Sequence, residues 1–525
     1  MNAETALHLL LVAGGALAVA ALARRKGWPA PLLLVLAGLL VSPLLPVVPL
    51  DPELVLFVFL PPLLYSAAIE SSYLRLRDVT RAVALLSIGL VLFTTLIVGW
   101  VTHLLLPELP LAAAFALGAI IAPPDAVAAV AVGRRLGLPR RLLTILIGES
   151  LFNDATALTV YRVAIGALVG GGVDLFDGIL EFVYAAAGGI AIGLALAWLF
   201  GRLLAMCHDS LVENTIMLLI PFAAYLAAEL VHASGVISVV LVGLYLGHRM
   251  YLQGFGTRLL SAGVWRVTNF FLETIVFALI GLQLLPILEG VAASERDILQ
   301  VTLYAVVIFV VTVVARFAWV FPATYLPSAV FKSSFRPPPQ NVVVLGWAGM
   351  RGVVSLAAAF AIPEEVADRD LLLFLSFTTV IATLLVQGLS FPALIRRLRV
   401  SSAGEEYEDT LAEAAAQEAA RDAGLRVLDR VIELEGEPDE LQASVFDQVR
   451  EKSERRALTA WERLGGGTAA GGSETPSALY RRVRLMMLDA ERATLVRLRD
   501  ERRIDDEVLR RMMAELDFEE AILER

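Results

Sequence analysis

Long apolar segments recur along residues 1–400 and alternate with short polar stretches. A helix needs about 20 apolar residues to cross the hydrocarbon core of a bilayer. The pattern therefore predicts an all-α membrane protein with about 13 transmembrane helices. The predicted spans are residues 5–23, 31–48, 53–70, 82–105, 110–133, 142–169, 178–201, 212–231, 235–248, 267–288, 298–325, 341–362 and 370–395.

The connecting segments differ in charge between the two sides of the predicted membrane. Those on one side carry 19 Lys and Arg residues, and those on the other carry only Arg296 and Arg369. Because cytoplasmic loops collect Lys and Arg, we expect the N-terminus outside and the C-terminal region in the cytoplasm. Arg24, Arg25 and Lys26 follow the first apolar segment, which favours a retained span over a cleaved signal peptide.

The composition changes near residue 399. The whole chain is 58% hydrophobic and 18% charged, yet residues 401–525 hold 30 of its 53 carboxylates. We predict a transmembrane domain over residues 1–398 and a helical cytoplasmic tail over 399–525, with a Gly-rich linker near 465–477. The acidic tail argues against a nucleic-acid partner. The single cysteine, Cys207, excludes an intrachain disulfide and a cysteine-based metal cluster.

Two of the apolar segments contain helix breakers and one charge each near their middle. The first contains APPDA (residues 122–126) and the second GWAGMRGVV (residues 346–354). They lie seven predicted spans apart, so they cross the membrane in opposite directions. Paired interrupted segments in two halves are typical of inverted-repeat transporters, which bind their cargo where the interruptions cross. We therefore predict inverted repeats with crossing interrupted helices.

The segment from Ile147 to Gly166 is apolar except for one polar face. Glu149, Ser150, Asn153 and Asp154 fall within about 140° of arc on a helix. Asp154 lies near the middle of its span, where an unpaired charge costs at least a few kcal/mol. Carboxylate, hydroxyl and amide oxygens are ligands that small hard cations prefer. The face therefore predicts a site for a monovalent cation at Asp154.

The first interruption supplies further candidates. Asp125 follows Pro123 and Pro124, whose missing N–H groups free backbone carbonyls that can bind a cation. Freed backbone at this depth is tolerated only where protein or a cavity satisfies it. Arg351 in the second interruption is the natural counter-charge to these carboxylates. The structural alternative is a buried ion pair, for example between Glu149 and Arg351.

Other charges within the apolar segments have structural interpretations. For Arg162 we favour an ion pair with Glu229 or a hydrogen bond to a carbonyl. Glu70 stands at the cytoplasmic end of its span and is expected at the membrane interface. Glu273 is either a supporting group for the cation site or a structural residue.

Five blocks of the sequence resemble a known family in content and order. GESLFNDATAL (residues 148–158) resembles the signature of the bacterial sodium/proton antiporters related to the eukaryotic sodium/proton exchangers, the NhaP-like branch. The resemblance covers roughly residues 5–400. The other blocks are FLPPLLYSA (59–67), IIAPPDAVA (120–128), GWAGMRGVVSLA (346–357) and VQGLS (386–390).

The resemblance implies secondary-active, electroneutral exchange of Na⁺ for H⁺ across the plasma membrane, with a role in pH and sodium homeostasis. It implies a homodimer embedded in lipid, and no cofactor besides the transported ions. It suggests that Asp154 binds the cation or the proton beside Asn153, and that Asp125 and Ser150 help to coordinate or polarise the site. The Asn-Asp pair resembles the electroneutral branch.

The resemblance also implies a supporting ion pair between Glu149 and Arg351. The sequence differs from the pattern of the family at two places. Pro124 stands where many members have Ser or Thr, so a hydroxyl is lost from the site and the ion selectivity stays open. Many exchangers also carry an acidic residue close to the Pro pair of the third span. Here LLYSAAIE (residues 63–70) lacks it, so no ligand can be carried over from that span.

Rival functions leave different signatures. No nucleotide-binding loop, HExxH or GxSxG motif is present, so an enzyme is not expected. A channel would pass ions without coupling them to protons. A K⁺(Na⁺)/H⁺ antiporter, or a proton-coupled transporter of an organic anion on a similar fold, remains the alternative to Na⁺/H⁺ exchange.

Overall fold

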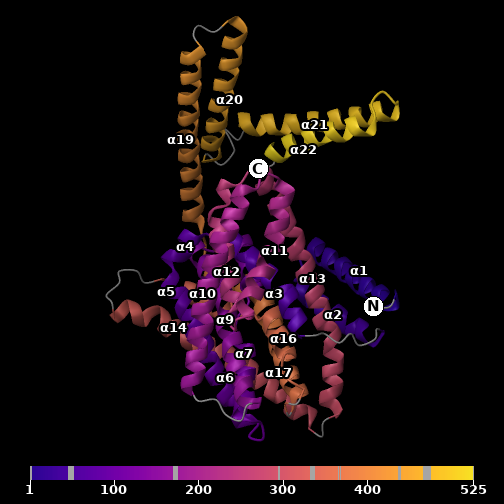
Figure 1. The fold of residues 1–525 in the computed structure, drawn as a ribbon, viewed down its shortest axis with the longest axis vertical. Helices are drawn as coiled ribbons and strands as arrows, with labels where there is room; N and C mark the ends of the chain where they lie inside the picture. The colour runs from indigo at the N-terminus through magenta and orange to yellow at the C-terminus, as the bar shows by residue number, and fades with distance from the viewer. Residues whose placement is uncertain are drawn as a thin grey trace. The chain divides into compact units, whose positions relative to one another are not determined.

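The computed structural model describes residues 3–44, 52–169, 175–293, 296–330, 337–364, 366, 368–435, 439–464 and 475–523. These residues form helices and their connections, with no β-strand among them (Figure 1). The chain divides into two compact units, Met1–Ser401 and Ser402–Arg525. The all-α prediction is confirmed for the part of the chain that the structure describes.

The first unit contains helices α1 to α18. Its first half has α1 (Ala3–Lys26), α2 (Ala30–Val41), η1 (Ser42–Leu44), α3 (Pro52–Glu70), α4 (Tyr73–Asp78), α5 (Thr80–Ala84), η2 (Leu85–Leu90), α6 (Val91–Leu105), α7 (Leu111–Ile121), α8 (Ala126–Arg135) and α9 (Arg140–Val169). Its second half has α10 (Leu175–Met206), α11 (Ser210–Glu229), α12 (Gly235–His248), η3 (Met250–Leu252), α13 (Phe255–Ala293), α14 (Ile298–Val330), α15 (Pro339–Trp347), α16 (Val353–Phe360), α17 (Arg369–Ala382), η4 (Thr383–Gly388) and α18 (Leu389–Leu398).

Seven helical segments among the described residues are long and apolar enough to cross a membrane: Thr80–Leu105, Leu111–Arg135, Asp177–Met206, Ser210–Glu229, Phe255–Ala293, Ile298–Leu326 and Arg369–Leu398. Three shorter apolar helices, Ala30–Leu44, Leu56–Glu70 and Gly235–His248, accompany them. Helix α9 is not among the seven, although it is 30 residues long; it carries the polar face described above. The chain is thus a multi-pass membrane protein.

The helices of this unit pack in two groups. In one group α13 lies along α2, and α12 lies against α3, α10 and α11. In the other group α7 packs on α6 and α9, and α14 packs on α6 and α15. Small residues permit the closest approaches: a Cβ on Gly281 of α13 would lie 2.3 Å from the Val35 carbonyl oxygen of α2. Such close backbone packing is typical of membrane helices.

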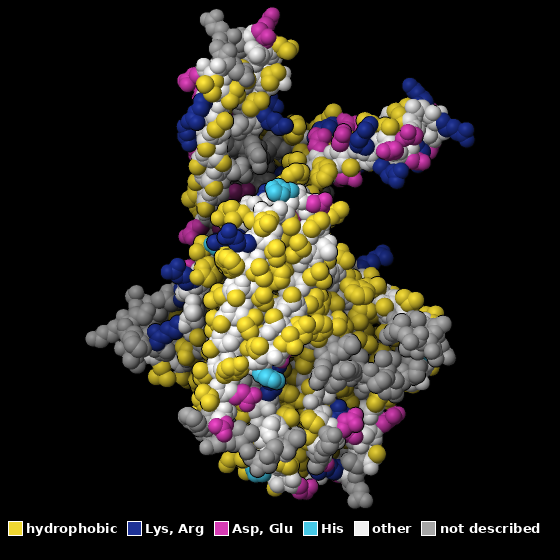
Figure 2. All heavy atoms as spheres, viewed as in Figure 1, with side chains coloured by type: hydrophobic (Ala, Val, Ile, Leu, Met, Phe, Trp, Pro, Cys, Tyr) yellow, Lys and Arg dark blue, Asp and Glu magenta, His cyan; other side chains and the backbone are white. Residues whose placement is uncertain are grey.

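The surface of this unit is apolar where lipid would cover it. On the face drawn in Figure 2, hydrophobic side chains cover most of the body of the unit, and charged side chains are sparse there. Helix α10 illustrates the pattern, since Ile179, Val183, Leu194 and Trp198 are each more than half exposed. Exposed apolar area of this extent is costly in water and favourable in a bilayer.

The second unit consists of two helical hairpins. Helix α19 (Ala403–Glu435) packs on α20 (Glu440–Leu464), and α21 (Pro476–Asp500) packs on α22 (Asp506–Leu523). Leu488 and Leu495 of α21 and Leu509 of α22 are buried. Of the predicted Gly-rich linker, residues 465–474 lie outside the described residues, as do Lys332 and Arg336 of a predicted connecting segment.

Candidate functional site

The first interruption is a break between α7 and α8 in which two helical hydrogen bonds are replaced. In an unbroken helix the Ile121 carbonyl would accept from Asp125 N–H. Instead, Asp125 N–H donates to the Met350 carbonyl at 2.6 Å, and Ala126 N–H donates to Ser150 Oγ at 3.4 Å. Pro123 and Pro124 cannot donate at all, which is why the helix ends here.

The second interruption, between α15 and α16, meets the first one directly. The hydrogen bond from Asp125 to Met350 joins the two breaks. Gly352 is the residue that allows this approach, because a Cβ at that position would lie 1.9 Å from Asp125 Oδ2. The predicted meeting of the two interrupted segments is therefore confirmed.

Asp125 is the N-cap of α8. Its Oδ1 accepts from Val127 N–H at 2.8 Å, and its backbone is extended with φ −97° and ψ 121°. The contact with Gly352, the N-cap of α16, also places this carboxylate at the start of a second half-helix. Negative charge is favourable at helix N-termini, so Asp125 complements both.

Arg351 donates hydrogen bonds to the backbone carbonyls on the α7 side of the first break. Its Nε donates to the Ile121 carbonyl at 2.8 Å, a second nitrogen donates to the Ala122 carbonyl at 3.4 Å, and a third donates to the Gly349 carbonyl. Its backbone N–H donates to Thr383 Oγ1 at 3.1 Å. The carbonyls freed by the break are thus occupied by a positive side chain, which suits the negative C-terminus of α7.

The predicted ion pair between Glu149 and Arg351 is wrong in its partner. Glu149 receives two hydrogen bonds from Arg316 of α14, at 2.5 and 2.9 Å, and both side chains are almost completely buried. Arg316 also donates to the Leu345 carbonyl near the end of α15 at 3.1 Å. Arg351 donates to carbonyls at the break and lies near enough to Glu149 to attract it, but the hydrogen-bonded partner of Glu149 among the described residues is Arg316.

Arg316 is a site residue that the sequence analysis missed. The available signal was a single arginine in the middle of the otherwise apolar stretch VVTVVARFAWVF (residues 310–321). A charge at that depth is expected to be paired or functional. It neutralises Glu149 and satisfies one carbonyl near the end of α15.

Helix α9 supplies the other predicted side chains. Asn153 Nδ2 donates to the Pro124 carbonyl at 2.6 Å, so another carbonyl of the break is occupied. Asn153 is fully buried, and its Oδ1 has no hydrogen-bond partner among the described residues. Ser150 accepts from Ala126 N–H, as stated above. Asn153 and Ser150 therefore hydrogen-bond α9 to the break, and Asn153 Oδ1 is left without a partner among the described residues.

Asp154 lines a cavity beside the crossing. The cavity has a volume of about 580 Å³ and is bordered by both breaks and by helices α2, α3, α9 and α13. Asp154 is 7% exposed, and no ion pair to it occurs among the described residues. Asp125, Ser150, Pro124 and Glu273 line the same cavity, so it brings together every predicted cation-site residue except Asn153.

The cavity is open at one end. Its exposed lining residues include Glu70 at the end of α3 and Arg134 at the end of α8. Both helices lead there into the Lys- and Arg-rich connections. Glu70 lies at this exposed mouth, in keeping with the expectation of an interfacial residue.

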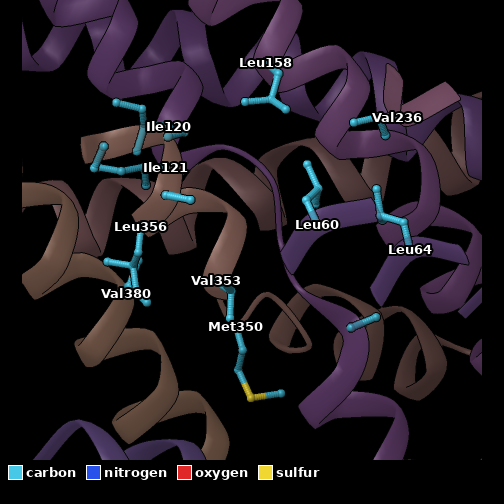
Figure 3. Close-up of a cluster of buried hydrophobic side chains, with 14 of the residues drawn as sticks. Leu60, Leu64, Ile120, Ile121, Leu158, Val236, Met350, Val353, Leu356 and Val380 are labelled. Carbon is cyan, nitrogen blue, oxygen red and sulfur yellow. The ribbon is translucent and has the colours of Figure 1, made fainter. Parts of the chain in front are cut away.

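The walls around the crossing are apolar. Figure 3 shows Ile120 and Ile121 at the end of α7, Met350 and Val353 at the second break, and Leu158 on α9. All five are less than 10% exposed. Apolar walls keep water from the freed backbone groups and strengthen the electrostatic interactions there.

Arg162 and Glu229 form the predicted ion pair. The guanidinium of α9 donates to both carboxylate oxygens of α11, at 2.8 and 2.9 Å. The side chains are 39% and 27% exposed, so the pair is half-buried. It links the two helix groups away from the cavity mouth.

Two interrupted helices that meet at their breaks, with a buried carboxylate and a cavity beside them, are typical of secondary transporters. The family model "Sodium/hydrogen exchanger, transmembrane" matches residues 11–397. The chain belongs to this family of transporters, and it is a secondary-active cation/proton antiporter.

Curated relatives carry names of the same kind. The chain is 34% identical over 511 residues to an uncharacterized Na⁺/H⁺ exchanger of Mycobacterium tuberculosis, covering 94% of this chain and 91% of the relative. It is 32% identical to the "Sodium, potassium, lithium and rubidium/H(+) antiporter" of Bacillus pumilus, covering 70% of this chain and 57% of the relative.

A solved structure shares the fold. The sodium proton antiporter MjNhaP1 from Methanocaldococcus jannaschii matches with a TM-score of 0.59 and 21% sequence identity, over 74% of this chain and 97% of that chain. At this identity the likeness concerns the fold alone.

Proposed function

We propose that Asp154 is the shared site at which this antiporter binds either a monovalent cation or a proton. The observation that supports this most strongly is a carboxylate only 7% exposed, lining a cavity, without an arginine or lysine partner among the described residues. Such a group is costly in the membrane as a bare charge. A cation or a proton removes that cost, and a site that changes access only when neutralised couples the two fluxes.

Neighbouring groups have distinct roles in this proposal. Asn153 Oδ1 and Ser150 Oγ are oxygen ligands beside Asp154, and Asp125 polarises the site from the two half-helix N-termini. Arg316 with Glu149, and Arg351 with the carbonyls of α7, hold the breaks in place. With one carboxylate exchanging one cation for one proton, no net charge moves, so the exchange is electroneutral.

The arrangement of the chain in the membrane is part of the proposal. We infer thirteen spans with inverted repeats, counting each interrupted or continuous apolar helix once, with the N-terminus outside and the tail in the cytoplasm. The open end of the cavity then faces the cytoplasm. We also propose a homodimer in the plasma membrane that contributes to pH and sodium homeostasis, with transport confined to residues 1–398 and no cofactor beyond the transported ions.

Na⁺ is the proposed cation, and K⁺ is the alternative. The name of the Bacillus pumilus relative supports a wider range, and the missing hydroxyl at Pro124 changes the ligand set. Proton-coupled transport of an organic anion is the second alternative, and it predicts no dependence on the cation supplied.

Proteoliposomes with a clamped membrane potential test the proposal. We expect proton flux to depend on Na⁺, Li⁺ or K⁺ in a panel of chloride salts, and to be absent in a correctly inserted Asp154→Asn protein, because an amide cannot carry the proton. Exchange that survives this substitution would remove Asp154 from the mechanism. A cation-driven current without the clamp would refute electroneutrality.

A further inference from the structure

Besides Glu70 at the exposed mouth, a third carboxylate lines the cavity from outside the group of crossing helices. Glu273 lies on α13 and lines the cavity together with Asp125 and Asp154. Asn269 and Phe277, one turn before and one turn after it, line the same cavity. Residues four apart share one face of a helix, so the register of α13 directs Glu273 toward the cavity.

The negative charge in the cavity exceeds what the buried arginines compensate. Asp125 is close enough to repel both Asp154 and Glu273. Of the two fully buried arginines, Arg316 donates to Glu149 and Arg351 donates to backbone carbonyls. Carboxylates gathered in one poorly solvated cavity require bound cations or protons to offset their repulsion.

Neutral oxygen atoms accompany the three carboxylates. Ser355 of α16 is 2% exposed and lines the cavity, and its Oγ has no partner among the described residues. Asn269 Oδ1 is shielded from solvent and is likewise without a partner in the described part of the chain. An unpartnered buried hydroxyl and an amide oxygen are costly unless a ligand uses them, and alkali cations bind such oxygens.

We propose that Glu273 is the charged ligand of a second cation position in this cavity. The position lies on the α13 wall, with Asn269 beside it on the same face and Ser355 as a further oxygen on another wall. A monovalent alkali cation occupies it between the exposed mouth, near Glu70 and Arg134, and Asp154. This inference rests on the proposed role of Asp154, since it describes the route to that residue.

A second position changes the kinetics in a specific way. It concentrates cations near Asp154 and removes part of their hydration before they reach it, but it carries no proton through the membrane. Glu273→Gln should therefore raise the cation concentration for half-maximal exchange about tenfold, the effect of losing one charge-assisted ligand, with little change in maximal rate. Glu273→Asp, which keeps the charge, should give a smaller rise.

The transport test uses the full-length protein in proteoliposomes at fixed pH, with Na⁺ titrated. Glu289→Gln is the matched control, because Glu289 lies on the same helix, is exposed and does not line the cavity. The control should keep the half-saturating Na⁺ concentration of the parent. Equal half-saturation in Glu273→Gln and Glu289→Gln would overturn the proposal. Loss of all exchange in a folded Glu273→Gln protein would overturn it too, because Glu273 would then be essential to the main site.

A binding test does not depend on transport. In Asp154→Asn, Na⁺ at constant ionic strength (NaCl replacing choline chloride) should still raise the unfolding temperature, because the second position remains. The double variant Asp154→Asn/Glu273→Gln should lose most of this stabilisation. Equal responses of the single and double variants would refute the second position.

The two proposals fail in different ways. Exchange that persists in Asp154→Asn would contradict the shared site, whatever Glu273 does. An inactive Asp154→Asn protein together with an unchanged half-saturation in Glu273→Gln would leave the shared site standing and contradict only the second position.

Discussion

Two arginines contact glutamates at nearly equal distances in opposite surroundings. Arg316 and Glu149 approach to 2.5 Å, with side chains only 1% and 2% exposed. In the second unit, Arg484 approaches Glu491 and Glu519 to 2.6 Å each, but the two carboxylates are 40% and 39% exposed. Breaking a buried pair leaves a charge without water, whereas an exposed pair regains water when it breaks. The contact distance therefore says little about how much an ion pair stabilises the fold. The burial of its two side chains determines the cost of breaking it.

The largest effect should come from Arg316→Met. The substitution leaves the Glu149 carboxylate buried without a partner, which typically costs about 3–5 kcal/mol. We expect a large fall in the unfolding temperature in detergent. The double variant Arg316→Met/Glu149→Gln should recover part of that loss, because no buried charge remains. A double variant as unstable as the single one would show that charge compensation is not the function of this pair.

A smaller but still large effect is expected from a change that removes no charge. Gly352→Ala places a methyl group 1.9 Å from Asp125 Oδ2, so the two breaks must separate. Overpacking of this kind costs about 1–3 kcal/mol, and exchange activity should fall with it. Gly263→Ala on α13 is the control, because a Cβ there meets nothing within 4 Å. Parent-like activity and stability of Gly352→Ala would contradict the close approach.

The half-buried pair should fall between the two extremes. Arg162→Gln removes the contact of one guanidinium nitrogen with both oxygens of Glu229, and the two side chains are 39% and 27% exposed, so we expect a loss of about 1 kcal/mol. Glu229→Gln should cost a similar amount. A double-mutant cycle on unfolding temperatures measures the coupling between them. Additive losses would mean that the two side chains do not stabilise each other.

The smallest effect is expected in the tail, and it should depend on pH. The hydrogen bond from Arg484 lowers the pKa of Glu519 below its usual range. A lowered folded-state pKa contributes stability above the unfolded value of about 4.3, and the contribution disappears as the pH falls through the folded value. Hydrogen-exchange protection of α21 and α22 should therefore decrease slightly on acidification from pH 6 to below 4.

The Arg484→Gln variant should lose most of that acid response. Arg450→Gln is the control, because Arg450 pairs with Asp429 in the other hairpin at 2.9 Å. It should leave the response of α21 and α22 unchanged. An unaltered acid response in Arg484→Gln would show that this ion pair does not set the pH dependence.

Features that depend on local chemistry could be predicted from the sequence. The two breaks could be expected from Pro123, Pro124 and the glycines around Arg351, because prolines and glycines weaken a helix. These residue types do not always end a helix, since Pro61 and Pro62 lie inside α3. The polar face of α9 follows from helical periodicity alone. The Arg162–Glu229 pair could be expected because each charge needed a partner in an otherwise apolar region.

Features that depend on which helices meet could not be predicted. The sequence suggested Arg351 as the partner of Glu149, and only the packing of α14 beside α15 shows that Arg316 donates to it instead. The side chain of Arg351 was then free to bind the carbonyls of α7. Glu273 reaches the cavity through the register of α13, which no local pattern records.

The hydrogen bonds that join the two breaks also determine the order in which the first unit can be completed during synthesis. The Ile121 carbonyl obtains its partner from Arg351, 230 residues later in the chain. At roughly 5–20 residues per second, the ribosome needs on the order of 10–50 s to supply that partner. For this period the first broken helix stands in or near the bilayer with unpaired backbone groups. The half-made protein therefore depends on water, lipid headgroups or the insertion machinery to satisfy them until its second half arrives.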